Sequence, residues 1–200
     1  DYTKGIRHRI KAYGELLDQG RISVEDVAFI QVASPSRERV DAYVHLRDEV
    51  ELAIGRINGD HDTLGHTAIR YLHQGFPREE MVAMYLAADV MLVTALRDGM
   101  NLVAKEYVAT RADNRGVLVL SEFTGAADEL RQAVRVNPHD IEGVKDAIVA
   151  AIEMPRTEQS RRMRSLRKRV LEHDVTAWSQ AFLKALEHAS QHRHHPEEPA

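Results

Sequence analysis

Two acidic residues and a glycine turn stand at the start of one predicted helix. The stretch from Arg97 to Glu106 reads Arg-Asp-Gly-Met-Asn-Leu-Val-Ala-Lys-Glu and follows the apolar run at 90–94. Such a run is typical of a buried parallel strand, and the residues after Gly99 favour helix, so the sequence predicts strand, turn and helix. The free amides of residues 100–103 then point to the carboxyl edge of the sheet. Together with the helix dipole they form an anion site that suits a phosphate.

The two acids of this stretch occupy different places. Asp98 lies in the turn, beside the predicted anion site. Glu106 follows Leu102 by four positions on the same helical face, one turn deeper, where a carboxylate can accept the hydroxyls of a ribose. The alternative is that Asp98 only caps the helix and Glu106 is only a solvated charge. Both interpretations stay open at this point.

Two cations, Lys4 and Arg37, stand where helices are predicted to begin. Lys4 precedes an amphipathic helix over Ile6–Leu17, and Arg37 follows a strand at 27–33 and opens a helix over about 38–57. A cation there opposes the helix dipole by about 0.3–1 kcal/mol. A desolvated charged hydrogen bond contributes about 1.5–3 kcal/mol, which outweighs that penalty. Both junctions are expected to face the same sheet edge as the Asp98 turn, so we interpret both cations as converging on anions there, although a solvated surface lysine is the alternative for Lys4.

The composition narrows the classes of protein. A chain of 200 residues with 44% apolar content is long enough for one sizeable core. We expect no membrane partner, because no run approaches the ~20 apolar residues of a membrane span. The absence of cysteine excludes disulfides and thiolate catalysis and favours a cytoplasmic location. The net charge of −4 argues against nucleic-acid binding. The histidines lack metal-ligand spacing, so we expect no metal site.

Strands predicted near residues 27, 69, 90, 117 and 134 alternate with helices, which predicts a doubly wound, Rossmann-like parallel α/β sheet. We also expect a strand before Asp1. No GxGxxG or P-loop motif occurs. A second small-residue turn at 121–127 contributes further amides to the anion site or serves packing only. Gly59 is expected to end the long helix as a left-handed cap.

The chain is expected to form one domain over residues 1–189, followed by a disordered polar tail at 190–200. The last helix, predicted over Val175–Ala189, carries an apolar stripe of Trp178, Phe182 and Leu186. Because aromatic side chains at this spacing favour burial, we expect the stripe to pack against another surface.

Four motifs together resemble one enzyme family. They lie at residues 1–6, 36–37, 55–59 and, most specifically, at the twelve positions from Leu96 to Tyr107. The chain, from Asp1 to about Leu186, resembles the trehalose-6-phosphate synthases, retaining transferases of glycosyltransferase family 20. The resemblance implies the C-terminal, donor-binding half of a GT-B fold. The whole enzyme would transfer glucose from a nucleotide diphosphate glucose, such as UDP-glucose, to glucose 6-phosphate, giving trehalose 6-phosphate with retention and without metal or other cofactor.

The resemblance also implies roles for individual residues. Lys4 would bind the donor diphosphate and Asp98 the hydroxyls of the transferred glucose, and both are the implied catalytic residues. Glu106 would bind the ribose, Phe76 the base and Arg37 the phosphate of the acceptor. Phe76 has the alternative of being a core residue. Further implied donor-binding positions are Gly99, Met100, Asn101, Leu102, Val103, Ala104 and Lys105.

The remaining catalytic groups of the family would come from an N-terminal domain of the same protein. This chain alone is therefore expected to bind the donor without turnover, and we expect the whole protein to be a homo-oligomer. Two alternatives stay open. One is a non-catalytic nucleotide-sugar sensor, and the other is a related GT-B transferase that uses a different acceptor.

Overall fold

The computed structural model describes residues 2–35 and 40–192, so Arg37 lies outside the described residues. A short 3-10 helix, Tyr2–Lys4, comes first. The other elements in chain order are α1 (Ile6–Asp18), β1 (Phe29–Val32), α2 (Asp41–His61), β2 (Ile69–Leu72), α3 (Arg78–Ala87), β3 (Val90–Val93), α4 (Leu102–Thr110), β4 (Val117–Ser121), α5 (Ala126–Glu129), β5 (Val134–Val136), α6 (Ile141–Ile152), α7 (Arg156–Glu172) and α8 (Val175–His192). The alternation of strands with helices confirms the predicted α/β class.

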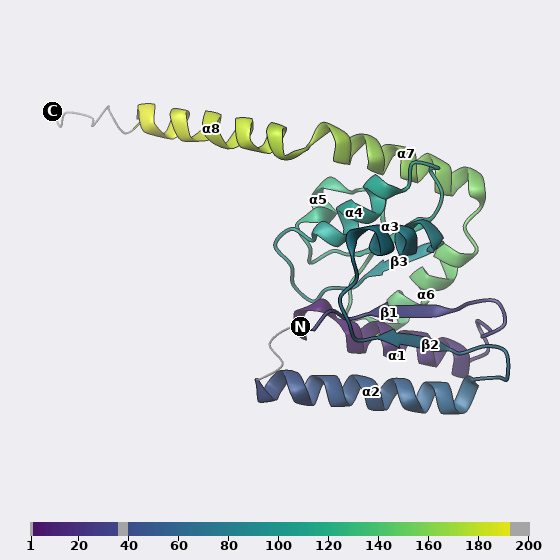
Figure 1. The fold of residues 1–200 in the computed structure, drawn as a ribbon. Coiled ribbons are helices and arrows are strands. Elements are labelled where there is room, and N and C mark those ends of the chain that lie inside the picture. The colour runs from purple at the N-terminus through teal and green to yellow at the C-terminus, as the bar shows by residue number, and fades with distance from the viewer. Residues whose placement is uncertain (1, 36–39, 193–200) are drawn as a thin grey trace.

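All the described strands are parallel, and they form two hydrogen-bonded groups. β1 pairs with β2, with Phe29 opposite Ile69. β3, β4 and β5 form the second group, in which Val90 lies opposite Val117. We expected one continuous sheet, whereas no strand pairing joins the two groups within the described residues. Figure 1 shows β1 lying between β2 and β3, so the free edge of β1 is turned toward β3.

The core is built around β4, in which every residue is buried. Leu118 and Leu120 pack on one face among residues of α4, α5 and α7. Val117 and Val119 pack on the other face, against α1 and α6. Successive side chains of a strand point to opposite faces, so an unbroken apolar run fits a strand that is covered on both sides.

Helix α1 connects the two strand groups. Its Leu16 belongs to the apolar cluster of β4, β5 and α6. Its Ile10, Tyr13 and Leu17 belong to a second cluster with α2 and β2. The amphipathic pattern predicted over Ile6–Leu17 is thus confirmed, and its apolar face is shared between two cores.

Two helices extend past their expected ends. Helix α2 continues through Gly59 to His61, and Gly59 is not among the residues with positive φ, so the predicted left-handed cap was wrong. The side chain of Asn58 hydrogen-bonds both backbone groups of Ile69, which ties this last turn to β2. Helix α8 runs past Ala189 to His192.

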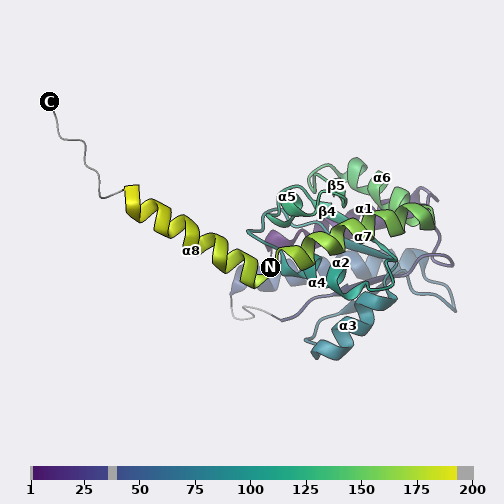
Figure 2. The same ribbon diagram turned by 90° about the horizontal axis from the view of Figure 1, so that it is seen from above.

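Helix α8 projects away from the rest of the structure in both ribbon views (Figures 1 and 2). The side chains of Trp178, Phe182 and Leu186 are between 55% and 61% exposed, so the apolar stripe packs against nothing in the described chain. Trp178 and Phe182 stack on each other, with 5.5 Å between ring centroids. Among the described helices, none is both long enough and apolar enough to cross a bilayer.

Candidate functional site

The structure brings Lys4 and Asp98 into direct contact. The Nζ of Lys4 lies 2.7 Å from Oδ2 of Asp98, although the residues are 94 positions apart. Two backbone contacts hold the segments together. The amide of Leu96 donates to the carbonyl of Thr3 at 2.7 Å, and a Cβ at Gly5 would collide with the carbonyl of Thr94. The start of α1 therefore rests directly on the end of β3, as the shared sheet edge predicted.

The carboxylate of Asp98 is held in its charged form. Partial burial by itself raises the pKa of Asp98, but the hydrogen bond and charge of Lys4 outweigh that effect. The side-chain Nδ2 of Asn101 also donates to Oδ2 at 3.0 Å, and the backbone amide of Met100 donates to Oδ1 at 3.4 Å. The net result is a lowered pKa, so Asp98 is an acceptor at neutral pH and suits ligand hydroxyl groups.

Asn101 shapes the start of α4. It adopts a left-handed conformation with φ 68°, and its Oδ1 accepts the amide of Ala104 at 3.0 Å. The backbone amides of Asn101, Leu102 and Val103 have no acceptor within the described chain. They are the free donors expected at a helix N-terminus, where the dipole also favours an anion. The helix start predicted after Gly99 is therefore confirmed, and Asn101 rather than Asp98 is its cap.

The turn at 121–127 serves packing rather than ligand binding through its amides. The amide of Gly125 donates to the carbonyl of Asp98, and that of Ala126 donates to the carbonyl of Met100. A Cβ at Gly125 would meet the carbonyl of Gly99. These contacts fix the Asp98 turn against the neighbouring strand end and leave the α4 amides as the open donors.

Glu106 lies on α4, one turn beyond Leu102, and is exposed. Its Oε2 accepts a hydrogen bond from the hydroxyl of Tyr85 on α3, at 3.2 Å. Burial, followed by the neighbouring charge of Glu106, raises the pKa of Tyr85 to about 12, so the tyrosine is a neutral donor. Sequence reasoning missed Tyr85, because no local pattern links residues on different helices.

The other predicted donor-binding positions differ in whether their polar groups are free to bind a ligand. Ala104 is fully buried, and its amide is used by the Asn101 cap. The Nζ of Lys105 lies 2.9 Å from both carboxylate oxygens of Glu129. Phe76 is half-buried in the loop between β2 and α3, and in the described residues it has no ring or hydrogen-bond contact with the Asp98 turn.

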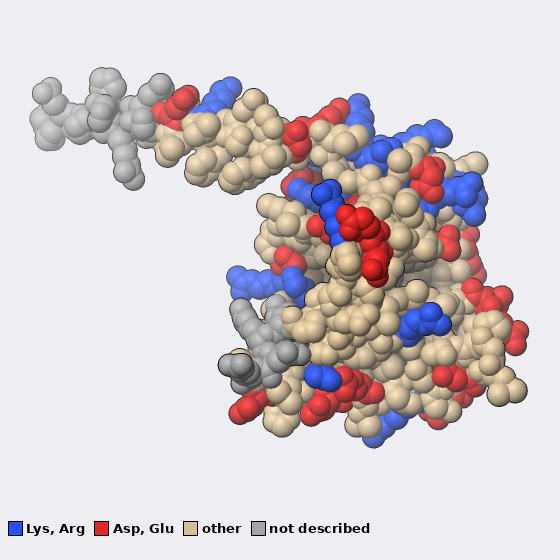
Figure 3. Space-filling view, in the orientation of Figure 1, with Lys and Arg blue, Asp and Glu red and all other residues tan. Residues whose placement is uncertain are grey.

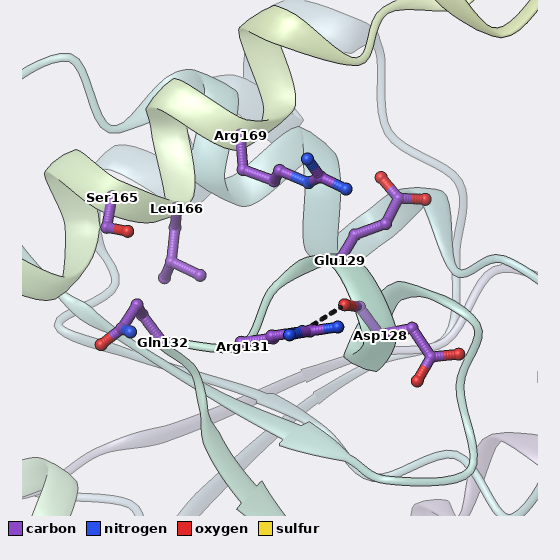
Figure 4. A pocket seen from close by; sticks show the side chains of 7 residues that line it. All are labelled: Asp128, Glu129, Arg131, Gln132, Ser165, Leu166 and Arg169. Atoms are coloured by element: carbon purple, nitrogen blue, oxygen red, sulfur yellow. Dashed lines mark hydrogen bonds between the residues drawn. The ribbon is translucent and has the colours of Figure 1, made fainter.

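Two hollows lie elsewhere on the surface. One, of about 460 Å³, lies between α5 and α7 and is lined by residues of both signs, with Arg131 donating to the carbonyl of Asp128 (Figure 4). The other, of about 530 Å³, is lined by Arg156, Arg161 and Arg164 of α7 with neighbouring hydroxyls. Figure 3 shows Lys and Arg side chains gathered over α7. Neither hollow contains a predicted site residue, and the α5–α7 hollow has its own carboxylates.

In the part of the chain that the structure describes, no three histidine, aspartate or glutamate side chains gather as a metal site would require. A family model named glycosyltransferase family 20 matches residues 1–188 of the chain. The chain belongs to glycosyltransferase family 20.

Curated relatives of this family 20 chain are trehalose-6-phosphate synthases. The protein of Mycobacterium avium strain 104 is 60% identical over 186 residues, which cover 93% of this chain and 38% of the relative. That of Mycobacterium leprae strain TN is 59% identical over 189 residues, covering 94% of this chain and 38% of the relative. The chain therefore spans well under half the length of the curated relatives it matches.

Solved structures give the same family and the same fold. A trehalose-phosphate synthase of Burkholderia xenovorans in complex with glucose-6-phosphate matches with a TM-score of 0.89 and 42% identity, over 94% of this chain and 42% of that one. A protein from E. coli bound with UDP-2-fluoro glucose matches with a TM-score of 0.89 and 42% identity, over 93% of this chain and 42% of that one. The parallel α/β fold of the family 20 chain is thus shared with these GT-B enzymes.

Proposed function

We propose that this chain is the donor-binding part of a trehalose-6-phosphate synthase, the C-terminal half of the whole protein. The whole enzyme would transfer glucose from a nucleotide diphosphate glucose to glucose 6-phosphate, with retention. The observation that carries the proposal is the corner formed by Lys4, Asp98 and the free amides of Asn101–Val103. It offers a cation and a helix dipole to an anion, and a charged acceptor to hydroxyls, at one place in the structure. A nucleotide diphosphate sugar has both groups.

The chemistry of transfer fits the same corner. When the bond to the sugar breaks, negative charge grows on the departing diphosphate. Lys4 and the α4 amides stabilise that charge more strongly in the transition state than in the ground state. Lys4 is paired with Asp98 at 2.7 Å, so a bound diphosphate competes with this carboxylate for the ammonium group. Asp98 is then released to accept hydroxyls of the transferred glucose, while Glu106 accepts those of the ribose and Phe76 contacts the base.

The acceptor side of the reaction requires the rest of the protein. Arg37 is proposed to bind the phosphate of glucose 6-phosphate, and the remaining groups are proposed to come from the N-terminal domain. The exposed stripe of α8 supports this arrangement, because Trp178 and Phe182 find no cover in the described chain. The match with this chain covers 38% of the Mycobacterium avium relative, so the rest of such a protein is long enough to cover the stripe.

The test uses the full-length protein with Lys4→Ala and Glu106→Ala. Each is expected to reduce formation of trehalose 6-phosphate at least about tenfold, because each removes a charged hydrogen bond to the donor. The matched control is Lys11→Ala, a lysine of α1 that is 65% exposed and lies near Glu15. Wild-type turnover in both site variants, with UDP-glucose and other nucleotide donors, contradicts the proposal. Donor binding without product in the wild type supports the sensor alternative.

A further inference from the structure

The side chain of Arg9 joins three separate segments at the donor corner. Its Nε donates to Oε1 of Gln31 on β1 at 2.8 Å. Its Nη1 donates to the backbone carbonyl of Lys4 at 2.8 Å and to Oγ1 of Thr94, directly after β3, at 3.2 Å. Gln31 and Thr94 are themselves buried. One guanidinium therefore ties the backbone of Lys4 to the ends of two strands that no strand pairing connects.

Among the residues that the structure describes, the charge of Arg9 has no acidic partner. No carboxylate of the described residues lies within ion-pair distance of it, and its three acceptors are neutral. Its position also disfavours a cation, because the amide of Arg9 makes the first bond of α1, to the carbonyl of Gly5. Burial lowers the pKa of Arg9 to about 10, so the group still carries its charge at neutral pH. Arg9 is partly buried, and a cation that is partly withdrawn from water without an acidic partner costs free energy, which packing alone does not explain.

The segment that Arg9 holds is a short turn before α1. Lys4 ends a three-residue 3-10 helix and is followed by Gly5, which is left-handed with φ 63°. The Lys4 side chain is 47% exposed, and its ammonium group pairs with Asp98. The position of its Nζ therefore depends on where its backbone lies. Leu96 holds Thr3, and Oγ1 of Thr94 donates to the carbonyl of Gly5 at 3.4 Å, while Arg9 holds the carbonyl of Lys4 itself.

We propose that Arg9 is a positioning residue for the donor diphosphate, which holds the Lys4 backbone between the ends of β1 and β3 so that the ammonium group faces the start of α4. This inference rests on the proposed function and extends it to a residue that does not touch the donor. The planar guanidinium is required, because it offers several N–H donors in fixed directions. A lysine has a shorter side chain and a compact ammonium group, so it cannot reach all three acceptors. The expected order of donor affinity is therefore arginine, then lysine, then glutamine.

The experiment measures the full-length protein with Arg9→Gln and Arg9→Lys. Binding of UDP by calorimetry and the KM values for UDP-glucose and glucose 6-phosphate are the readouts. For Arg9→Gln we expect UDP affinity to fall and the donor KM to rise by at least about tenfold, as for loss of a charged hydrogen bond. The KM for glucose 6-phosphate should change less than about twofold, and Arg9→Lys should lie between glutamine and wild type. If Arg9 had only a structural role, Arg9→Gln would lower the melting temperature but would not raise the donor KM more than the KM for glucose 6-phosphate in this selective way.

Arg7→Gln is the matched control, since Arg7 lies on the same helix, is 58% exposed and pairs with Glu49. If Arg9→Gln does not fold, Thr94→Val removes one acceptor with little change of shape, and we expect it to raise the donor KM about threefold. Wild-type UDP affinity in whichever of these variants folds overturns the role of Arg9. Wild-type UDP affinity in Lys4→Ala instead overturns the proposed donor site, so the two failures are distinguished.

Discussion

Replacing Asn101 tests the link between the left-handed cap and the anion site of α4. In Asn101→Ala three contributions are lost. The cap bond to the amide of Ala104 contributes about 1 kcal/mol. An alanine at φ 68° costs about 1 kcal/mol. The bond to the carboxylate of Asp98 contributes about 1 kcal/mol more at this partly buried place. The start of α4 should therefore be destabilised by about 3 kcal/mol.

Asn101→Gly separates the backbone effect from the side-chain effect. Glycine adopts the left-handed conformation freely and replaces a cap residue at a cost of only a few tenths of a kcal/mol. The loss then falls to about 1.5 kcal/mol, most of it from the bond to Asp98. Because the free amides depend on the backbone at this position, donor affinity should fall in the order asparagine, glycine, alanine.

Amide hydrogen exchange in the full-length protein measures both variants. Tyr107 and Val108 are fully buried on α4, so their exchange reports opening of this helix. We expect it to accelerate about 100-fold in Asn101→Ala and about tenfold in Asn101→Gly. Asp140→Ala is the matched control, since it removes the cap of α6 and leaves the donor site intact. Unchanged exchange and an unchanged donor KM in Asn101→Ala would refute the reasoning.

Three further predictions concern other contacts. Tyr85→Phe removes the donor to Glu106, and we expect the donor KM to rise about threefold with the glucose 6-phosphate KM unchanged; an equal rise in both would contradict a role in donor binding. Lys4→Ala should raise the pKa of Asp98, whose carboxylate stabilises the fold above its unfolded pKa and loses this effect as pH falls through its lowered folded pKa. The free energy of unfolding, measured as a function of pH, should begin to fall at a higher pH in the variant than in the wild type. An unshifted profile would argue against the ion pair. Finally, the outward amides of β1 and β3 should exchange slowly in the full-length protein, because we expect a strand from upstream sequence to pair with both edges; rapid exchange there would exclude such a strand.

Local sequence signals predicted the start of α4 and the amphipathic face of α1 correctly. A glycine turn between an apolar run and helix formers has few alternatives, and Ile10, Tyr13 and Leu17 repeat at helical spacing. The convergence of Lys4 and Asp98 was predicted from one rule, that parallel strands present their carboxyl ends at a common edge. These successes concern patterns within one element or within one junction.

Contacts between elements could not be predicted from the sequence. Nothing local distinguishes Arg9 from Arg7 on the same helix, since the role of Arg9 depends on Gln31 and Thr94 meeting in space. The sequence predicted a helix end at Gly59, but α2 continues beyond it, and the neighbouring Asn58 hydrogen-bonds β2. The division of the strands into two groups likewise follows from pairing, which the alternation of strands and helices leaves open.

The central claim is that the free amides at the start of α4, with Lys4 opposite, hold the diphosphate of the donor. The most direct measurement is amide hydrogen exchange of Asn101–Val103 in the full-length protein, with and without saturating UDP. We predict that UDP slows exchange of these amides, and that Lys4→Ala weakens both UDP binding and this protection. If UDP binds and exchange at Asn101–Val103 does not change, the diphosphate lies elsewhere and the account is wrong.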